Sequence, residues 1–528
     1  MENNRKEIER RRTFAIISHP DAGKTTLTEK LLLYGGAIRE AGSVKARKAS
    51  RHATSDWMEI EKQRGISVTS SVMQFNYEGF CINILDTPGH QDFSEDTYRT
   101  LMAADSAVMV IDGAKGVEAQ TKKLFEVCSL RGIPVFTFIN KMDRETRDPF
   151  ELLQEIEDVL GIKSVAVNWP IGSGQNFKGI YERNSENILM FSGGKHGSAE
   201  SHIDTVNISD DKINSLIPSD FLKKLHEDIE LMDIAGNTFE LDKVRTGDLT
   251  PVFFGSALTT FGVEPFLESF LKLTESPHAR KSDKGIVSPF EDYFSAFVFK
   301  IQANMNPQHR DRIAFMRIVS GKFERGIEVY HMEGNGKVKL TQPQQFLAQD
   351  REIIEEAYAG DIIGVFDPGI YSIGDTLCPP SDKFKFEPIP AFAPELYARI
   401  RPMDTMKRKQ FVKGVTQIAQ EGAIQIYRED YAGMEEIIAG VIGVLQFEVL
   451  EYRLKNEYGV EIRIEHLPYR FVRWIDKLPD KIETLSLTSD SRKLVDMKNR
   501  NVIIFSNEWG ITWALDHNKG LELKGIGN

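Results

Sequence analysis

The sequence predicts an α/β P-loop domain followed by a β-barrel domain and an α+β domain. Near the N-terminus, an apolar β-prone run, TFAIIS, precedes the loop SHPDAGKT and a segment of helical spacing. Short strands separated by glycine-rich breaks fill the middle of the chain, and strand–helix–strand alternation fills its last part. We expect domains at 1–278, 285–385 and 386–528, which fits the three or four domains that 528 residues suggest at ~100–200 residues each.

The composition excludes several classes of protein. The chain has 528 residues, with 66 Lys and Arg against 78 Asp and Glu, so its net charge is −12 and RNA contacts must come from local basic patches. Three separated cysteines, Cys81, Cys128 and Cys378, argue against a disulfide framework or a zinc site. No apolar run approaches ~18 residues, and no apolar segment follows the charged N-terminus. We therefore expect a cytoplasmic protein without a membrane span.

Residues 18–26, SHPDAGKTT, have the composition of a phosphate-binding loop. Backbone N–H groups at a helix N-terminus bind phosphate, and Gly23 allows close backbone approach. Lys24 is expected to reach the β- and γ-phosphates, and the Thr25 hydroxyl to bind Mg²⁺. A serine replaces the glycine that usually begins this motif, so a chance Gly-Lys-Thr stays an alternative at this point. The candidate contacts are Ser18, His19, Pro20, Asp21, Ala22, Gly23, Lys24, Thr25 and Thr26.

Three further polar segments each follow an apolar strand. Open α/β sheets bind ligands at the carboxyl ends of their strands, so we expect these segments to join the loop at one site. The candidates are Asp86, Thr87, Pro88, Gly89 and His90 in DTPGH, Asn140, Lys141, Met142 and Asp143 in NKMD, and Ser256 and Ala257 in GSAL.

The chemistry of these segments points to a guanine nucleotide. Asp86 at a strand end suits a second Mg²⁺ contact through water, and the Gly89 N–H suits the γ-phosphate. The Asp143 carboxylate can accept both N1–H and N2–H₂ of guanine, a donor pair that adenine lacks. A backbone N–H of Ser256 or Ala257 can meet guanine O6. Each segment alone also fits a helix start or a turn, but together, in this order, they favour GTP.

SHPDAGKTT, RGIS, DTPGH, NKMD and GSAL resemble the five signature segments of translational GTPases. Ser18 with Pro20, and the surrounding RHATSDWMEIEKQRGIS and INILDTPGHQDFSEDTYRTL, resemble in particular the bacterial members that act in translation termination. The resemblance runs along essentially the whole chain and is most specific in its first half. It implies a ribosome-dependent GTPase that stimulates release and recycling of class I peptide chain release factors. GTP/GDP and Mg²⁺ are the implied cofactors, and the ribosome, including large-subunit rRNA, and class I release factors are the implied partners of a monomer.

The resemblance also implies roles for residues near the γ-phosphate. His90 is the expected catalytic residue and orients the attacking water, while Pro20 and Ile66 form an apolar gate in front of it. Ser67 is the expected third Mg²⁺ contact beside Thr25 and Asp86, with Thr69 as the alternative. Residues 42–71 are polar and suit a mobile loop that orders around the γ-phosphate. No arginine has positional support as a finger, which implies activation in trans by the ribosome.

The remaining segments predict the organisation downstream. The long interval between NKMD and GSAL predicts an insertion between about 165 and 250, with a helix over DFLKKLHEDIELM and a loop near FSGGKHGSAESH. The strands YFSAFVFKI, RIAFMRIVSGKF, IEVYHM and DIIGVF suit a barrel that resembles domain II of translational GTPases. The basic segment MKRKQF, residues 406–411, either contacts RNA phosphates or forms a solvated helix face.

Other functions remain alternatives at this stage. The first is another elongation-type ribosomal GTPase that acts in biogenesis or stress. The second is a GTP-regulated binding module with negligible turnover, and the third is a metabolic subunit that carries an elongation-type G domain. A GTPase assay with and without ribosomes separates the last two from the ribosomal GTPases.

Overall fold

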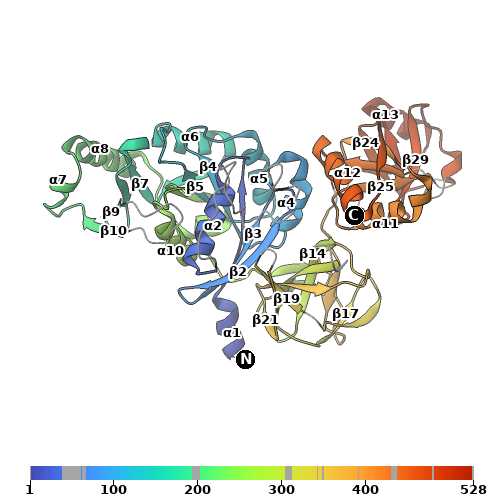
Figure 1. The fold of residues 1–528 in the computed structure, drawn as a ribbon, viewed down its shortest axis with the longest axis horizontal. Helices are drawn as coiled ribbons and strands as arrows, with labels where there is room; N and C mark the ends of the chain where they lie inside the picture. Colours follow the sequence, from blue (N-terminus) through green and yellow to red (C-terminus); the bar gives the residue numbers. More distant parts are fainter. Residues whose placement is uncertain are drawn as a thin grey trace.

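The computed structural model describes residues 2–37, 61, 67–192, 202–303, 312–341, 343–347, 350–390, 392–429, 437–478 and 481–525. Three parts follow one another along the chain (Figure 1): an α/β part, a barrel of short strands and a C-terminal α+β part. This order confirms the predicted fold class, whereas the exact domain boundaries stay a prediction. Among the described residues, none of the helices is long and apolar enough to span a membrane.

The α/β part is built on a sheet of six parallel strands in the order β3-β1-β4-β5-β11-β6, with β2 antiparallel at the edge beside β3. Strand β4 is buried along its whole length, which explains the continuous apolar run AVMVI. The strands are β1 (Arg11–Ser18), β2 (Ser71–Tyr77), β3 (Phe80–Asp86), β4 (Ser106–Asp112), β5 (Val135–Asn140), β6 (Lys163–Ala166) and β11 (Leu249–Phe254).

Helices cover both faces of this sheet. Apolar side chains of α2 (Lys24–Tyr34) and α10 (Val263–Leu273) form one core with one face of the strands. Those of α4 (Ser94–Leu101), α5 (Ala119–Leu130) and α6 (Pro149–Leu160) belong to the core on the other face. The first helix, α1 (Glu2–Glu9), precedes β1 and is drawn at the N-terminal end in Figure 1.

The predicted insertion lies between β5 and β11 and contains more regular structure than its polar sequence suggests. Strands β7 (Asn168–Ile171), β8 (Gly179–Glu182), β9 (Asn187–Ser192) and β10 (His202–Asn207) form an antiparallel sheet. Helices α7 (Ile213–Leu216), α8 (Ser219–Ala235) and α9 (Leu241–Thr246) follow it, and α8 confirms the helix expected over DFLKKLHEDIELM. The expected loop near FSGGKHGSAESH falls on residues 193–201, which lie outside the described residues.

The hairpin β12 (Arg280–Ser282) and β13 (Gly285–Val287) leads into the barrel. The long strands β14 (Ser295–Ala303) and β15 (Arg312–Ser320) form its centre, where their alternating apolar side chains meet in one core. Its other strands are β16 (Lys322–Glu324), β17 (Glu328–His331), β18 (Gly336–Lys339), β19 (Pro343–Leu347), β20 (Asp350–Ile353), β21 (Glu356–Tyr358), β22 (Ile362–Phe366) and β23 (Thr376–Cys378).

The barrel is attached to the α/β part through buried polar contacts. Asp361 of the barrel accepts hydrogen bonds from Arg11 Nε at 2.7 Å and from Gln74 Nε2 at 2.8 Å. Arg317 of the barrel pairs with Asp105 at 2.5 Å. Because Arg11 is buried in this contact, at least one arginine of the basic N-terminal segment has a structural role.

The C-terminal part has an eight-stranded sheet in the order β27-β24-β26-β25-β29-β30-β28-β31. Helices α11 (Arg408–Gln420) and α12 (Val444–Tyr458) share a core with its first half, and α13 (Glu508–His517) shares one with its second half. Its strands are β24 (Leu396–Pro402), β25 (Gln425–Arg428), β26 (Ile437–Val441), β27 (Ile462–Leu467), β28 (Phe471–Lys477), β29 (Ser491–Asp496), β30 (Asn501–Phe505) and β31 (Glu522–Lys524).

Candidate guanine-nucleotide site

The phosphate-binding loop connects the end of β1 to the start of α2. Asp21 and Gly23 adopt left-handed backbone conformations, with φ of 67° and 101°. A Cβ on Gly23 would lie 2.2 Å from Asn140 Nδ2, so glycine is required there for space as well as for conformation. Ser18 is instead the last residue of the extended strand β1. This explains why the missing first glycine of the motif does not prevent the loop from forming.

Lys24 and Asp86 form an ion pair at the floor of the loop. Lys24 Nζ lies 2.5 Å from Asp86 Oδ1, and the two side chains are only 6% and 2% exposed. Thr28 Oγ1 also donates to Asp86 Oδ1, at 3.3 Å. Thr25 and Thr26 stand half-buried at the start of α2. The lysine expected at the phosphates and the carboxylate expected near Mg²⁺ therefore lie side by side, although they are distant in sequence.

Asn140 connects three of the predicted segments. Its Nδ2 donates to the Ala22 carbonyl at 2.9 Å, and its Oδ1 accepts from the backbone N–H of Lys141 and of Ala257, both at 2.8 Å. One buried amide thus joins the phosphate loop, NKMD and GSAL. The Ala257 N–H is directed at Asn140 in this arrangement, and the expected contact of this segment with guanine O6 stays a prediction.

The NKMD and GSAL segments are also joined at their polar ends. Ser256 Oγ donates to Asp143 Oδ1 at 2.5 Å, and the Met142 N–H donates to the Gly255 carbonyl at 3.1 Å. Ser256 and Met142 are buried, whereas Asp143 is partly exposed. A buried hydroxyl therefore fixes the carboxylate that the sequence assigns to guanine.

The sequence analysis did not single out Asp112, which belongs to the same end of the site. It ends strand β4, and its Oδ2 lies 2.6 Å from Lys141 Nζ, which also donates to the Asp21 carbonyl at 2.5 Å. Burial opposes ionisation of Asp112, but hydrogen bonds from Lys141 and the Ala114 N–H hold its pKa below the usual value. The sequence offered one signal for Asp112, a carboxylate at the end of a predicted strand, and this residue belongs to none of the motifs.

His90 stands at the other end of the site. It precedes the short 3₁₀ helix η1 (Gln91–Phe93), and its Nδ1 accepts from the Asp92 N–H at 3.2 Å. The imidazole is 31% exposed. A Cβ on Gly89 would lie 3.5 Å from the Pro20 nitrogen, so the DTPGH segment lies against the phosphate loop. Thr87 anchors this segment through a hydrogen bond from its hydroxyl to the Ile16 carbonyl at 2.7 Å.

The end of the predicted mobile loop is held by a residue that the sequence analysis passed over. Glu61 Oε1 accepts from the N–H groups of Val68 and Thr69, at 2.9 and 3.0 Å. Ser67 is half-buried, and both it and Thr69 stay candidates for the Mg²⁺ contact. Ile66, the expected gate partner of Pro20, lies outside the described residues, as do residues 38–60 of the loop.

Known proteins share this architecture along the whole chain. Residues 9–276 match the elongation factor Tu GTP binding domain, residues 293–379 match elongation factor G domain 2, and residues 386–515 match the C-terminal domain of class II release factor RF3. Proteins named peptide chain release factor 3 are 58% identical in Symbiobacterium thermophilum and 53% in a Cyanothece species. The first match covers 98% of this chain and 97% of the relative, and the second covers 98% and 96%.

The chain belongs to the peptide chain release factor 3 family. Membership confirms the predicted GTPase, its activation by the ribosome and its function in termination, where it stimulates recycling of class I release factors. It also confirms GTP and GDP as ligands. Among solved structures, the crystal structure of ttk003000868 from Thermus thermophilus matches at a TM-score of 0.67 and 22% identity, over 92% of this chain and 72% of that chain, which supports the fold.

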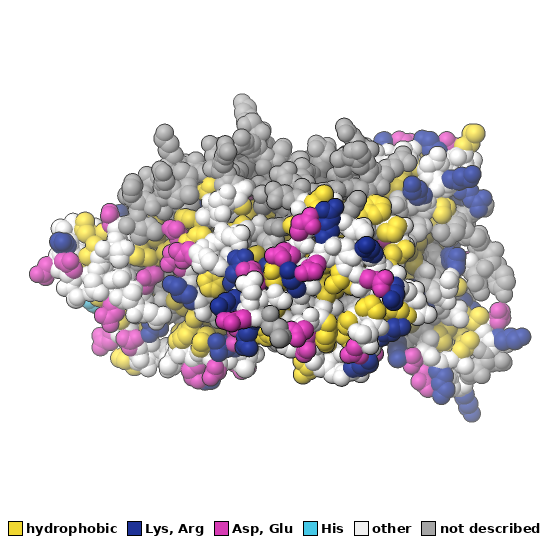
Figure 2. Space-filling view, turned by 90° about the horizontal axis from the view of Figure 1, so that it is seen from below, with side chains coloured by type: hydrophobic (Ala, Val, Ile, Leu, Met, Phe, Trp, Pro, Cys, Tyr) yellow, Lys and Arg dark blue, Asp and Glu magenta, His cyan; other side chains and the backbone are white. Residues whose placement is uncertain are grey.

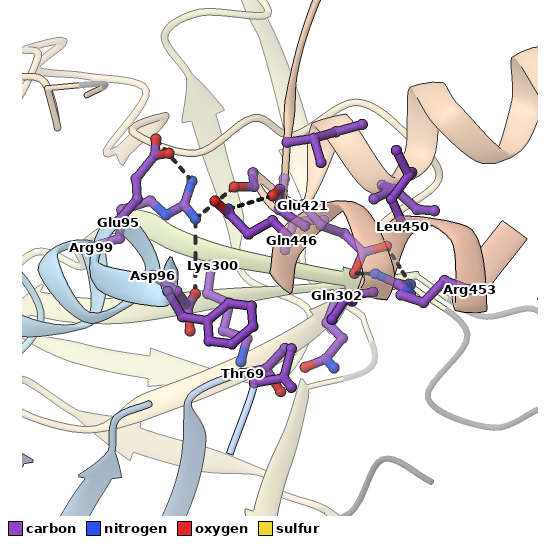
Figure 3. A pocket seen from close by; sticks show the side chains of 18 residues that line it. Thr69, Glu95, Asp96, Arg99, Lys300, Gln302, Glu421, Gln446, Leu450 and Arg453 are labelled. Carbon is purple, nitrogen blue, oxygen red and sulfur yellow. Dashed lines mark hydrogen bonds and ion pairs between the residues drawn. The ribbon is translucent and has the colours of Figure 1, made fainter. Parts of the chain in front are cut away.

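In this member of the family, a pocket lies where the three parts meet (Figure 3). Helix α4, which follows η1, contributes Asp96 and Arg99. Arg99 Nη2 donates to the Gly422 carbonyl of the C-terminal part at 3.0 Å. Asp96 Oδ2 accepts from Ser70 Oγ at 2.5 Å, and the Lys300 ammonium from the barrel donates to the Ser70 carbonyl.

The charged groups around Asp96 explain why its pKa is lowered. Burial opposes its ionisation, but Lys300, Arg99 and the hydrogen bonds from Ser70 together hold its pKa below the usual value. The chain from residue 67 to helix α4 is thus held by contacts with all three parts.

Proposed function

We propose that this release factor 3 family member hydrolyses GTP at the ends of β1, β3, β5 and β11, and that this reaction drives class I release factors from the ribosome after termination. The observation that carries the proposal is the connection made by Asn140. It joins the phosphate loop to NKMD and GSAL, so that phosphate and base contacts belong to one site. Ligand binding at the carboxyl ends of parallel strands is general for open α/β sheets.

In this proposal the phosphates are held by the loop of residues 18–26 and by Gly89, with Lys24 supplying the charge. Thr25, Asp86 through water, and Ser67, with Thr69 as the alternative to Ser67, would hold Mg²⁺. These are hydroxyl and carboxylate oxygens, the ligands that Mg²⁺ prefers, so the residues present fit the ion. The ion would supply charge neutralisation between the β- and γ-phosphates.

The base would be recognised at the opposite end. Asp143 would accept from N1–H and N2–H₂ of guanine, while Ser256 holds its carboxylate in place. The Lys141 side chain, held between Asp112 and the Asp21 carbonyl, would lie along the nucleotide. Met142 is buried and supports the segment by packing, so its contribution to binding is indirect.

His90 would orient the attacking water and stabilise the transition state electrostatically, since phosphoryl transfer requires little early proton removal. Activation would come from the large subunit of the ribosome, through contacts that include its rRNA. On one face of the molecule, Figure 2 shows acidic and basic side chains of the described residues interspersed, so no broad basic field forms there. The protein would act as a monomer in the cytoplasm, where ribosomes are found.

The segment MKRKQF is a candidate for a local RNA contact. It spans a short 3₁₀ helix, η3 (Thr405–Lys407), and the start of α11, and Met406 is 90% exposed. Lys407, Arg408 and Lys409 are exposed beside it. Exposed cations of this kind bind phosphates by displacing counterions, although a solvated helix face has the same appearance.

The deciding experiment uses post-termination ribosomes that carry a labelled class I release factor. We expect GTP to accelerate dissociation of the factor beyond the rates with GDP or a non-hydrolysable analogue. The variant Asp143→Asn supplies an internal control, because it should lose the effect with GTP and regain it with XTP. Ribosome-stimulated hydrolysis without accelerated dissociation would contradict the proposal and favour another ribosomal task, in biogenesis or stress.

A further inference from the structure

Asp92 contacts both the catalytic histidine and a helix of the C-terminal part. Its N–H donates to His90 Nδ1 at 3.2 Å, and its Oδ1 lies 3.3 Å from the same nitrogen. Its Oδ2 accepts from the Leu445 N–H at 2.8 Å. Leu445 is in the first turn of α12, where backbone N–H groups lack partners within the helix. One buried side chain thus caps a helix of another part of the molecule and faces the imidazole.

The approach of α12 to Asp92 requires a glycine. A Cβ on Gly443, which precedes α12, would lie 1.9 Å from Asp92 Cγ. Gly443 has a φ of −137°, so space rather than backbone strain dictates the glycine. The Gly443 N–H donates to Gln446 Oε1 at 3.1 Å, and the Leu445 N–H donates to Asp92 Oδ2. A carboxylate at this position is also favoured by the positive end of the helix dipole.

Neighbouring contacts hold the same segment against the C-terminal part. Phe93 packs with Val68 and with Val449 of α12 in a small apolar cluster. Arg99 reaches the Gly422 carbonyl, where a Cβ on Gly422 would lie 1.8 Å from Arg99 Nη1. Figure 3 shows Arg99 of α4 and Gln446 of α12 among the side chains that line this pocket. The chain after His90 therefore rests on α12 and on the turn that joins α11 to β25.

Asp92 faces His90 Nδ1 with two groups, its N–H at 3.2 Å and its Oδ1 at 3.3 Å. The N–H favours an unprotonated Nδ1 and the carboxylate oxygen a protonated one, so the position of Asp92 sets both the orientation of the ring and the balance of its tautomers. If α12 withdraws, Oδ2 loses its partner and η1 loses the apolar contact of Phe93. Both the position of Asp92 and the hydrogen bond to Nδ1 then change.

We propose that Asp92 is a positioning residue that couples docking of α12 to the orientation and tautomer of His90. The inference rests on the proposed role of His90 in hydrolysis. It makes GTP hydrolysis depend on the placement of the C-terminal part, while the affinity for nucleotide does not depend on it. Contacts of the ribosome or of a release factor with that part thereby reach the γ-phosphate through one carboxylate.

The test compares Gly443→Ala, which pushes a methyl group into Asp92 from the other side, with Asp92→Ala. Val444→Ala is the matched control, because Val444 starts the same helix and is 55% exposed. We expect Gly443→Ala and Asp92→Ala to lower ribosome-stimulated turnover about ten- to a hundredfold, the range for a displaced catalytic group. The Kd for GTP and GDP and the melting temperature of the α/β part should stay near those of Val444→Ala.

The double variant Asp92→Ala with Gly443→Ala tests the coupling itself. Removing the carboxylate makes room for the new methyl group, so the double variant should lose no more activity than Asp92→Ala alone. Additive losses would overturn the coupling, because they would place the two residues in separate roles.

A spectroscopic measurement separates positioning from mere support. In ¹⁵N-histidine spectra, with His90 assigned by its loss in His90→Ala, we expect the balance of the Nδ1–H and Nε2–H tautomers of His90 in Gly443→Ala to differ from that in the parent protein. Normal turnover and an unchanged tautomer in Gly443→Ala, with His90→Ala inactive, overturn only the inference about Asp92. Normal turnover in His90→Ala overturns the proposed role of His90 and the inference with it.

Discussion

The two ends of the nucleotide site are supported in different ways. At the guanine end, Asn140 and Asp143 find their partners, Ala22, Ala257 and Ser256, within the α/β part itself. At the γ-phosphate end, the chain around His90 depends on other parts. Asp92 is bound to Leu445, Ser70 to Lys300 and Arg99 to Gly422.

This difference separates recognition from hydrolysis. The guanine end is pre-organised by short hydrogen bonds within one core, so domain movement leaves base recognition intact. The γ-phosphate end is completed by a side chain of the barrel and by backbone groups of the C-terminal part, so domain movement changes its geometry. A protein that must hold nucleotide firmly but hydrolyse it only on the ribosome needs this division, since an equilibrium shifts only through contacts that differ between its states.

Lys24→Ala should have the largest effect, because it breaks the Lys24–Asp86 pair beneath the phosphate loop, which both ends of the site share. It removes the charge expected at the phosphates and leaves the buried Asp86 without its cation, and losing one partner of a buried ion pair costs about 3–5 kcal/mol. We expect binding of a fluorescent GDP analogue to weaken about 10³-fold or more. Lys122→Ala, which alters an exposed lysine of α5, is the control. Tight binding by Lys24→Ala would remove this lysine from the phosphate site.

Asp143→Asn should affect the guanine end alone. The amide cannot accept both guanine N–H groups, and each hydrogen bond to a charged group is worth about 1.5–3 kcal/mol. We expect GTP affinity to fall on the order of 10²-fold and XTP affinity to rise, measured by competition against labelled GDP. Unchanged GTP affinity would contradict the assignment of the base contact, whatever the effect on hydrolysis.

His90→Ala should affect the γ-phosphate end alone and complete the comparison. A positioned histidine typically contributes about 10²-fold or more to a transfer reaction, so ribosome-stimulated turnover should fall by that order. The Kd for GTP and GDP should be unchanged, because His90 is 31% exposed and lies outside the Lys24–Asp86 pair. A loss of affinity for GTP and GDP as large as the loss of turnover would show that the two ends of the site are not independent.

Lys300→Met sharpens the claim that hydrolysis depends on other parts. The methionine keeps the length of the side chain but removes the donor to the Ser70 carbonyl and the cation near Asp96. We expect a several-fold loss of stimulated turnover with unchanged nucleotide affinity, because residues 67–70 lose their support from the barrel. Lys322→Met, in the same barrel but paired with surface carboxylates, is the control. Equal activity of the two variants would show that GTP hydrolysis does not depend on the contact between Lys300 of the barrel and Ser70.

Local sequence was sufficient to predict the segments that the structure brings together at the candidate site. The loop around Lys24, the strand-end polar residues and the helix expected over 220–232, observed as α8, follow from residue types and spacing, which act within a few residues. The supporting contacts were not predictable in this way. Lys300 reaches Ser70, and Asp92 reaches Leu445, across hundreds of positions in the sequence. Neither Lys300 nor Leu445 belongs to a sequence motif. Both contacts depend on how complete domains dock.

Asp112 was also not predicted, although its partner Lys141 lies within the same α/β part, and it gives the smallest expected effect. Its pKa is lowered in the folded protein, so its contribution to stability is present above the usual aspartate value and is lost as the pH falls through the folded value. We expect the free energy of unfolding of the parent protein to fall more steeply below about pH 4 than that of Asp112→Asn, in urea titrations without nucleotide. Parallel pH profiles would mean that the contact with Lys141 serves placement of the lysine and adds nothing to stability. The guanine end would then be rigid through Asn140 and Ser256 alone.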